Sequence, residues 1–371
     1  MPSQQNLNNG LNFSGGPGAL PAAVLAQVQE SIMCVPEVGL SILGISHRSD
    51  WFLGVVTELE NNIRHLLGLD KTYHVLFLQG GATQQFSMVP MTLLHGKNKR
   101  PEYLHTGYWS GKVLGEARKE TNPHVLWSGE SDGFHRLPAN DELDFSAEAP
   151  YLHYVSNETV EGLQFHRVLG RDDVPRVCDM SSDFLSKPCE AERFSIIYAH
   201  AQKNIGPAGV TVVLIQDELL QNMPDNLPGW LDYRSHIKAH SNYNTPPVFA
   251  IYVVLLVTRW LLDDIGGLNA MNTLNQRKAA LLYEALDQSD GFYLGRAART
   301  DRSVMNAVFN LKTPELEQRF LSASRDAGFS GLSGHRAIGG IRASMYNGLE
   351  LQAVEKLVEF MSTFQKNESS S

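Results

Sequence analysis

A lone lysine, Lys203, stands in the stretch "YAHAQKNIGPAGVTVVLI" (198–215), between two apolar runs. Lysine is among the residues least often buried, yet here it falls at a tight Gly/Pro turn between two predicted strands. A lysine in an apolar setting shifts toward its neutral amine, the form that makes Schiff bases with carbonyl groups. A structural ion pair is the alternative interpretation. The position therefore makes Lys203 a candidate nucleophile.

An aspartate, Asp179, ends the apolar run "RVCDM" (176–180), one predicted strand before Lys203. A carboxylate there would be expelled to solvent, would cap the following segment, or would meet a buried cation. Neighbouring strand ends would allow Asp179 and Lys203 to face each other.

Two further strand ends carry residues suited to a flat, anionic ligand. The stretch "FLQGGATQQF" (77–86) is a strand, a Gly-Gly turn and a helix start, whose backbone N–H groups form an anion site. The stretch "TGYWSGK" (106–112) places Trp109 before a helix, as a platform for an aromatic ring. The alternative interpretation of 77–86 is a tight turn that binds no ligand, and that of Trp109 is an aromatic residue packed in the core.

Three arginines stand among glycine and apolar residues. Arg48 lies in "ISHRSDW" (45–51), and Arg336 and Arg342 lie in "GHRAIGGIRAS" (334–344). Arginine holds carboxylate and phosphate bidentately, so the set indicates a substrate with two anionic ends. A surface position is the commoner explanation for any single arginine.

The bulk composition limits the partners. The chain has 371 residues with 43% apolar and 19% charged residues, which favours a globular protein of about two domains. Its net charge of −9 and pI near 5.8 argue against nucleic acid and anionic membranes as partners. The N-terminus lacks the pattern of a signal peptide, and the apolar run 248–257 is too short to span a bilayer. Three cysteines without metal spacing fit a reducing, cytoplasmic setting.

These residues need a scaffold, and the pattern predicts an α/β one. Apolar runs typical of strands are 74–79, 102–106, 124–127, 151–156, 176–180, 194–199 and 210–215. Helical stretches between them include 51–69, 84–94 and 111–120. This alternation predicts a mostly parallel sheet covered on both faces. Ligands of such sheets bind beyond the carboxyl ends of the strands.

The alternation of strands and helices ends after "NTPP". There we predict a helix with Thr245 as N-cap and Pro246 as its first residue. Later helices are expected at 271–288, 314–328 and 349–365, with strands near 305–311 and 338–346. This pattern indicates a smaller α+β domain. We predict a large domain at 18–262 and a small domain made of 1–17 and 263–371.

Two motifs for other chemistries are weak. "GESDG" (129–133) matches the G-x-S-x-G of hydrolases, but a loop-like segment rather than a helix follows it. "HIKAH" pairs His236 with His240, but it lacks the glutamate of H-E-x-x-H. No G-x-G-x-x-G follows a predicted strand, which argues against a dehydrogenase. A non-catalytic interaction protein stays open on motifs alone.

An amine nucleophile, an acidic partner, a flat aromatic, a phosphate cradle and paired arginines are together what pyridoxal 5′-phosphate (PLP) requires. In that interpretation Lys203 binds the cofactor covalently, and Asp179 keeps the pyridine nitrogen protonated. Trp109 stacks on the ring, and backbone N–H groups hold the phosphate.

The chain also resembles the phosphoserine aminotransferases, which are class-V, fold-type I PLP enzymes, along nearly its whole length. The matching stretches are "NFSGGPGALP", "GISHRS", "GYWSGKVLGEA", "YVSNETVEG", "AQKNIGPAGVTVV", "YNTPPVFAIY", "MNAVFNL" and "GHRAIGGIRASMYN". The resemblance implies the fold-type I architecture: a large domain with a mostly parallel sheet between helices, plus a smaller α+β C-terminal domain.

The resemblance also implies roles for single residues. Lys203 would be the Schiff-base lysine and Asp179 the pyridinium partner. The other implied cofactor contacts are Trp109 on the ring, Thr159 at its 3-oxygen, and Ala82, Thr83 and Gln202 at the phosphate. Across an obligate homodimer with shared sites, the implied contacts are Asn244 and Thr245 at the phosphate of the other subunit's cofactor. The implied substrate-anion ligands are Arg48, His335 and Arg336, with Arg342 as the carboxylate clamp.

The reaction implied by the resemblance is amino transfer from L-glutamate to 3-phosphohydroxypyruvate, giving 2-oxoglutarate and O-phospho-L-serine in serine biosynthesis. It is a ping-pong cycle in which Lys203 relays a proton. Whether 4-phosphohydroxythreonine, of pyridoxine biosynthesis, is also a substrate stays open. Cysteine desulfurase needs a cysteine well after the lysine, whereas the last one here, Cys189, precedes it. Alanine–glyoxylate type transaminases remain an alternative, although they have no substrate phosphate for the "GHR" pair.

Three positions depart from the family pattern. Thr83 stands where some members carry arginine, and Gly15 stands where some carry serine. His200 replaces a frequent glycine ahead of "AQKN". The departures bear on substrate preference more than on the chemistry.

Overall fold

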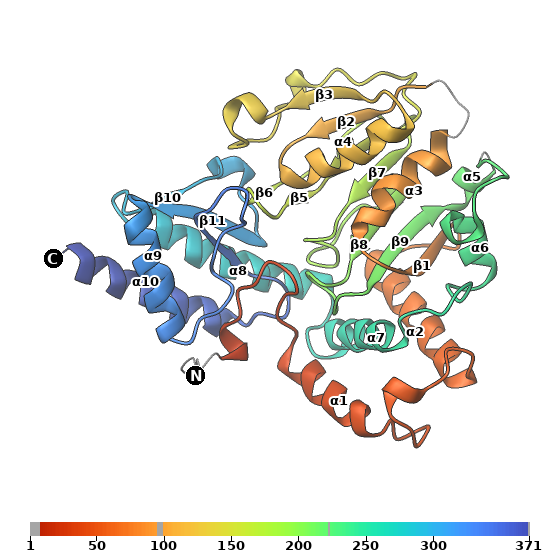
Figure 1. The fold of residues 1–371 in the computed structure, drawn as a ribbon, viewed down its shortest axis with the longest axis horizontal. Coiled ribbons are helices and arrows are strands. Elements are labelled where there is room, and N and C mark those ends of the chain that lie inside the picture. The colour runs from red at the N-terminus through yellow and green to blue at the C-terminus, as the bar shows by residue number, and fades with distance from the viewer. Residues whose placement is uncertain (1–7, 95–98, 222, 370–371) are drawn as a thin grey trace.

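The computed structural model describes residues 8–94, 99–221 and 223–369. Within these ranges one sheet has seven strands (Figure 1). They are β1 (Tyr73–Gln79), β2 (Glu102–His105), β3 (His124–Ser128), β4 (Leu152–Val155), β7 (Arg176–Asp179), β8 (Ile196–His200) and β9 (Val210–Gln216). Their order is β1-β9-β8-β7-β4-β2-β3, and only β9 runs antiparallel to its neighbours among these pairs. The predicted mostly parallel sheet is confirmed, with strand ends within two residues of the predicted ones.

Helices cover both faces of this sheet, as Figure 1 shows. One face packs against α1 (Ala22–Met33), α2 (Asp50–Leu67) and α7 (Val248–Asp263). The other packs against α3 (Ala82–Leu94), α4 (Tyr108–Glu120) and α6 (Tyr233–Lys238). In β1, Val75 and Phe77 belong to the first core, whereas Leu76 and Leu78 belong to the second. Since side chains alternate along a strand, a continuous apolar run is what a sheet buried on both faces needs.

The helix α2 illustrates how the sequence determines an element. Its N-cap Ser49 accepts a hydrogen bond from the Phe52 N–H, and Gly68 ends it in the left-handed conformation at φ +66°. The apolar face at helical spacing packs onto the sheet through Phe52, Val55, Val56, Leu59, Ile63 and Leu67. Cap residues and periodicity agree here, so the prediction of a helix was confirmed.

A second, smaller sheet lies beside the first in Figure 1. Its strands are β10 (Tyr293–Gly295), β11 (Asn306–Leu311) and β12 (Ile341–Ser344), all antiparallel. The helices packed on it are α8 (Leu268–Asp287), α9 (Pro314–Asp326) and α10 (Leu351–Ser369). Its hydrophobic core includes Leu11 and Phe13 from the N-terminal segment. The two separate cores support the division near 262, which stays a prediction.

One predicted helix start was wrong. The helix after "NTPP" begins at Val248, and Pro247 is its N-cap, so Thr245 and Pro246 lie outside it. A residue before proline is disfavoured in the α region, which applies to both of them. The helix itself is buried as expected, from Ala250 to Thr258. No helix in the described part of the chain has the length and apolarity needed to cross a bilayer.

Some short elements had no prediction. These are β10, the hairpin of β5 (Asn157–Glu158) and β6 (Leu163–Gln164), α5 (Asp217–Leu220) and α6. The histidines of "HIKAH" do not share a helix face. His236 lies in α6 and bonds the Trp230 carbonyl, whereas His240 follows the helix with a positive φ.

Candidate active site

The pocket that holds the predicted catalytic pair lies at the carboxyl end of the large sheet. Asp179 is the last residue of β7, and Lys203 follows β8 by three residues. Because β7 and β8 are parallel neighbours, both residues reach the same edge. Both line one pocket of about 240 Å³. Its other lining residues are Gly81, Ala82, Thr83, Phe86, Trp109, Ser181, His200 and Gln202.

The Lys203 side chain is almost fully buried, with 8% of the residue exposed. Its Nζ donates to Thr159 Oγ1 at 2.6 Å and to Ser182 Oγ at 3.1 Å. It also lies 4.9 Å from the centre of the Trp109 ring. Burial lowers the pKa of Lys203 to about 8, against the opposing influence of Asp179 and Glu158. The ammonium form still predominates at pH 7, but the neutral amine that a nucleophile requires is far more populated than in a free lysine.

The Asp179 carboxyl group is 4% exposed and accepts a hydrogen bond from the Ser181 N–H at 2.8 Å. Burial raises its pKa, whereas the Lys203 ammonium works in the opposite direction. A cationic group bound next to Asp179 would favour the carboxylate form of Asp179. Asp179 is thus positioned to hold a protonated ring nitrogen.

A run of backbone N–H groups forms one wall of the pocket. Gly80 has a φ of +96°, which glycine adopts without strain, and α3 begins two residues later at Ala82. Ala82 and Thr83 therefore offer first-turn amides, together with the positive end of the helix dipole. Gln202 lines the same pocket from the lysine loop. This is an anion site made mainly of neutral donors.

Two buried carboxylates orient Trp109. Glu158 accepts hydrogen bonds from the Trp109 and Ser110 N–H groups at 3.0 and 2.9 Å, and Glu161 accepts from the Tyr108 N–H at 3.0 Å. They satisfy the first-turn donors of α4, which no cap side chain serves. Burial raises the pKa of both, that of Glu161 to about 8. Neither carboxylate had a predicted role, because the motif "SNETVEG" does not show which helix they cap.

Three of the predicted substrate-anion ligands, His335, Arg336 and Arg342, lie close enough to one another for their charges to interact. The His335 ring contacts the Tyr108 ring at 4.6 Å between centres, next to Trp109. Burial and the nearby Arg342, Arg336 and Lys203 lower the pKa of His335. The four groups thus form a cluster that an anion would stabilise.

Comparisons with known proteins agree with this geometry. A family model described as "Aminotransferase class-V" matches residues 11–357. The phosphoserine aminotransferase of Rhodopirellula baltica is 44% identical over 359 residues, covering 96% of each chain. The chain belongs to the class-V aminotransferases, among the phosphoserine aminotransferases.

Solved structures of the family share the whole fold of this aminotransferase. The phosphoserine aminotransferase from Bacillus circulans subsp. alkalophilus is 43% identical with a TM-score of 0.93, covering 96% of this chain and 98% of that one. A PLP-bound phosphoserine aminotransferase from Trichomonas vaginalis is 34% identical with a TM-score of 0.88, covering 95% of this chain and 99% of that one. The fold-type I architecture expected from the sequence is confirmed.

PLP is the cofactor of the class-V aminotransferases, and the Lys203 pocket fits it. The Trp109 Nε1 is buried and has no hydrogen-bond partner in the part of the chain that the structure describes, so it is a donor left for a ligand. The Thr159 hydroxyl stands beside Lys203 Nζ, where a ring oxygen would lie next to the Schiff base. The aminotransferase therefore brings a buried amine, an aromatic ring, a carboxyl group and the first amides of a helix together in one pocket, as the predicted PLP site requires.

The predicted carboxylate clamp, Arg342, lies on β12 with its Nε buried and unpartnered among the described residues. Burial lowers its pKa. A Cβ at Gly15 would stand 2.4 Å from its guanidinium carbon, so glycine at this position lets the arginine approach the N-terminal segment. A serine at this position would move that guanidinium.

Some predicted site residues lie outside the pocket of their own chain. Arg48 and Thr245 are exposed, Asn244 is half-buried, and none of the three lines the Lys203 pocket. Arg336 is exposed beside His335. The roles predicted for these residues stay predictions.

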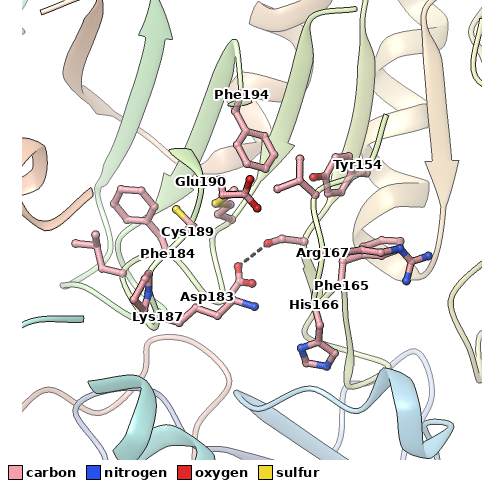
Figure 2. Close-up of a pocket in the computed structure, with 15 residues that line it drawn as sticks. Tyr154, Phe165, His166, Arg167, Asp183, Phe184, Lys187, Cys189, Glu190 and Phe194 are labelled. Atoms are coloured by element: carbon pink, nitrogen blue, oxygen red, sulfur yellow. Dashed lines mark hydrogen bonds between the residues drawn. The ribbon is translucent and has the colours of Figure 1, made fainter. Parts of the chain in front are cut away.

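A larger pocket, of about 410 Å³, is lined in part by the loop 180–190 (Figure 2). Its wall includes Tyr154, Phe165 and Phe194, and none of the predicted site residues lines it. Hydrogen bonds next to this pocket anchor the loop 180–190. The Asp183 carboxylate accepts hydrogen bonds from Ser156 and Gln164, the first of which is dashed in Figure 2. Asp183 thereby anchors the loop that presents Ser182 to Lys203, a role with no signal beyond the short motif "SSD".

Proposed function

We propose that this aminotransferase transfers the amino group of L-glutamate to 3-phosphohydroxypyruvate, giving 2-oxoglutarate and O-phospho-L-serine. The observation that carries the proposal is a buried Lys203 of lowered pKa in one pocket with Asp179 and Trp109, close enough to Arg342 and His335 for their charges to interact. The names of the relatives support the acceptor. When bound, PLP supplies an electron sink and carries the amino group between the two half-reactions.

The residues of the chain supply positioning and proton transfer. Lys203, as a neutral amine, takes the proton from the substrate Cα and returns it on the other side of the transfer. A pKa of about 8 suits both directions near neutral pH. Thr159 and Ser182 hold the amine in place through their hydroxyl groups.

Both substrates carry two anionic ends, which suits the cationic cluster. In the proposal Arg342 binds the α-carboxylate, and His335 and Arg336 bind the distal phosphate or carboxylate. Arg342 Nε lacks a partner in the described ranges, which supports a ligand role. A substrate such as alanine, whose side chain carries no anion, would leave His335 and Arg336 without a ligand.

The proposal includes a homodimer with shared sites in the cytoplasm. Arg48, Asn244 and Thr245 do not line the pocket of their own chain, so a second copy would bring them to it. Mixing tests this. Lys203→Ala and Asn244→Ala/Thr245→Ala are each expected to be impaired alone, whereas refolding them together should recover about a quarter of native activity, because each heterodimer holds one intact site. If the refolded mixture is no more active than the two variants measured separately and added, the proposal of shared active sites is overturned.

The function itself is tested by visible absorbance. The purified protein should carry a band that L-glutamate bleaches and 3-phosphohydroxypyruvate restores, and Lys203→Ala should not complete this cycle. Hydroxypyruvate and glyoxylate are the control acceptors, and 4-phosphohydroxythreonine is tried as a second amino donor. Restoration by only an unphosphorylated acceptor would leave a transaminase but overturn the roles of His335 and Arg336.

A further inference from the structure

A histidine lies in the pocket that holds Lys203 and Asp179. His200 is the last residue of β8, is 8% exposed, and lines the pocket with Gly81, Thr83 and Gln202. It thus shares the pocket wall with the residues at the start of α3, and Thr211 Oγ1 links its ring to the Gly80 carbonyl in the turn before that helix. A glycine at this position would offer no side chain there.

Hydrogen bonds determine the tautomer of the His200 ring. The Thr211 hydroxyl donates its one proton to the Gly80 carbonyl at 3.1 Å. Thr211 Oγ1 lies 3.0 Å from His200 Nδ1, so it must accept there, and Nδ1 carries a proton. Nε2 is then the nitrogen that is unprotonated in the neutral ring. Gln202 approaches the ring and favours its charged form.

The pocket has little positive charge to offer a phosphate. Its titratable lining groups are Asp179 from β7, Lys203 from the loop after β8, and His200 itself. The α3 wall contributes Gly81, Ala82, Thr83 and Phe86, and β9 contributes Thr211 next to the ring, none of them charged at neutral pH. In the PLP interpretation Lys203 is used for the covalent bond, and Thr83 carries no charge. A phosphate dianion would therefore meet neutral donors, apart from the imidazole.

We propose that His200 is a ligand of the cofactor phosphate in this protein, with Nε2 taking up a proton when the phosphate binds and supplying the positive charge that Thr83 lacks. Burial and Lys203 lower the pKa of His200 in the pocket without ligand, so the ring starts mainly neutral at pH 7. Phosphate binding reverses this balance, since a charge-assisted bond favours the imidazolium. The proposal rests on PLP as the cofactor and not on the identity of the amino acceptor.

The test compares the affinity of the apoprotein for PLP with its affinity for pyridoxal, which lacks the phosphate. Both form the same bond with Lys203, so their ratio cancels the titration of that lysine. Between pH 7 and 9, where the phosphate stays largely dianionic, the native ratio should fall with rising pH, by at most about tenfold per unit for one proton taken up.

His200→Gln and His200→Gly should lower the ratio at pH 7 by about tenfold or more and remove its pH dependence. His105→Gln is the matched control, because His105 is half-buried, bonds Ser128 Oγ through Nδ1 at 3.0 Å, and lies outside the pocket. Circular dichroism checks that each variant is folded. In the PLP-loaded protein, nitrogen NMR should show both ring nitrogens of His200 protonated at pH 7.5.

The same pH slope in the native protein and in His200→Gln would overturn the proposal. A lower ratio with an unchanged slope would also overturn it, because a merely structural role through Thr211 predicts that result. A native protein that binds PLP no better than pyridoxal would show that the phosphate cradle itself is wrong. None of these outcomes depends on turnover, so they are distinguishable from a failure of the proposed reaction.

Discussion

The Lys203 ammonium donates to the Thr159 hydroxyl at 2.6 Å, and Thr159 in turn shares a hydrogen bond with Ser182. The two hydroxyls thus keep the reactive amine between the Trp109 ring and the sheet edge. A hydrogen bond to the charged form favours that form, so Thr159 opposes the effect of burial on the lysine. The hydrogen bond acts in the same direction as the charges of Asp179 and Glu158, which oppose the effect of burial on the pKa of Lys203.

Thr159→Val should lower the pKa of Lys203 further. Loss of one hydrogen bond of about 1 kcal/mol corresponds to a downward shift of about 0.7 pH unit. The measurement is the pH dependence of the rate at which the apoprotein captures PLP. Ser182→Ala, which removes the longer bond, should shift the midpoint less. An unchanged midpoint in Thr159→Val would contradict this account.

Asp179→Ala should slow the half-reaction with L-glutamate by on the order of 100-fold, since a charge-assisted bond to the ring nitrogen contributes about 1.5–3 kcal/mol. PLP should still bind covalently. Single-turnover absorbance measures the rate. Reconstitution with N-methylated PLP, whose ring is permanently cationic, should restore much of it, because the carboxylate is then not needed to keep the charge. Equal rates with both cofactors would argue against the role of Asp179.

Gly107→Ala should destabilise the protein and weaken PLP binding. A Cβ at Gly107 would stand 2.4 Å from Glu161 Oε2 and 2.8 Å from Glu158 Cδ, the carboxylates that hold the first turn of α4. Overpacking of this kind costs about 1–3 kcal/mol. Gly115→Ala in the same helix meets nothing within 4 Å and should instead stabilise by about 0.5–1 kcal/mol. Urea unfolding and quenching of tryptophan fluorescence by PLP measure the two effects, and equal behaviour of the two variants would refute the capping role.

Gly15→Ser should displace the Arg342 guanidinium and raise the KM for L-glutamate about fivefold, as expected for the loss of about 1 kcal/mol of binding, with little change in kcat. Arg342→Lys should have a larger effect on KM, because lysine cannot bind a carboxylate bidentately. Steady-state kinetics with both substrates provide the readout, and Gly115→Ser is the control for an added hydroxyl. A fall in kcat without a change in KM would contradict the predicted role of Arg342 in binding the carboxylate of L-glutamate.

Lys278 is a buried ammonium that no carboxylate within the described ranges pairs with. Its Nζ donates to the carbonyls of Met345, Tyr346 and Leu349 at 3.0, 2.8 and 3.0 Å, which ties α8 to the segment after β12. Burial lowers its pKa to about 7. Since a free lysine titrates near 10.4, the unfolded chain binds more protons between about pH 7 and 10, and stability should rise with pH there.

Lys278→Met removes this dependence. From pH 7 to 9, the free energy of unfolding of the native protein minus that of the variant should increase by at most about 1.4 kcal/mol per pH unit. Urea denaturation at three pH values measures it. Lys203 contributes to both proteins alike, so it cancels in the difference. Parallel curves for the two proteins would mean that Lys278 stays charged throughout.

The sheet and its covering helices were predictable because local patterns determine them. Continuous apolar runs occur in strands buried on both faces, and α2 carries its own cap, apolar face and terminal glycine. The start of α7 was not predicted correctly, because Thr245 before Pro246 matched a cap pattern. Two successive prolines shift the first helical residue to Val248, since each disfavours the α region in the residue before it.

The sequence by itself was enough to predict that Lys203 and Asp179 meet at one edge of the sheet. Each is a polar residue at the end of an apolar run, and parallel neighbouring strands end at the same edge. Only the tertiary structure decided how the pocket is supported. Glu158 and Glu161 cap a helix that precedes them by about fifty residues, and the His200 tautomer depends on a hydroxyl of the neighbouring strand. Such roles arise from contacts between segments distant in the chain, which local spacing does not record.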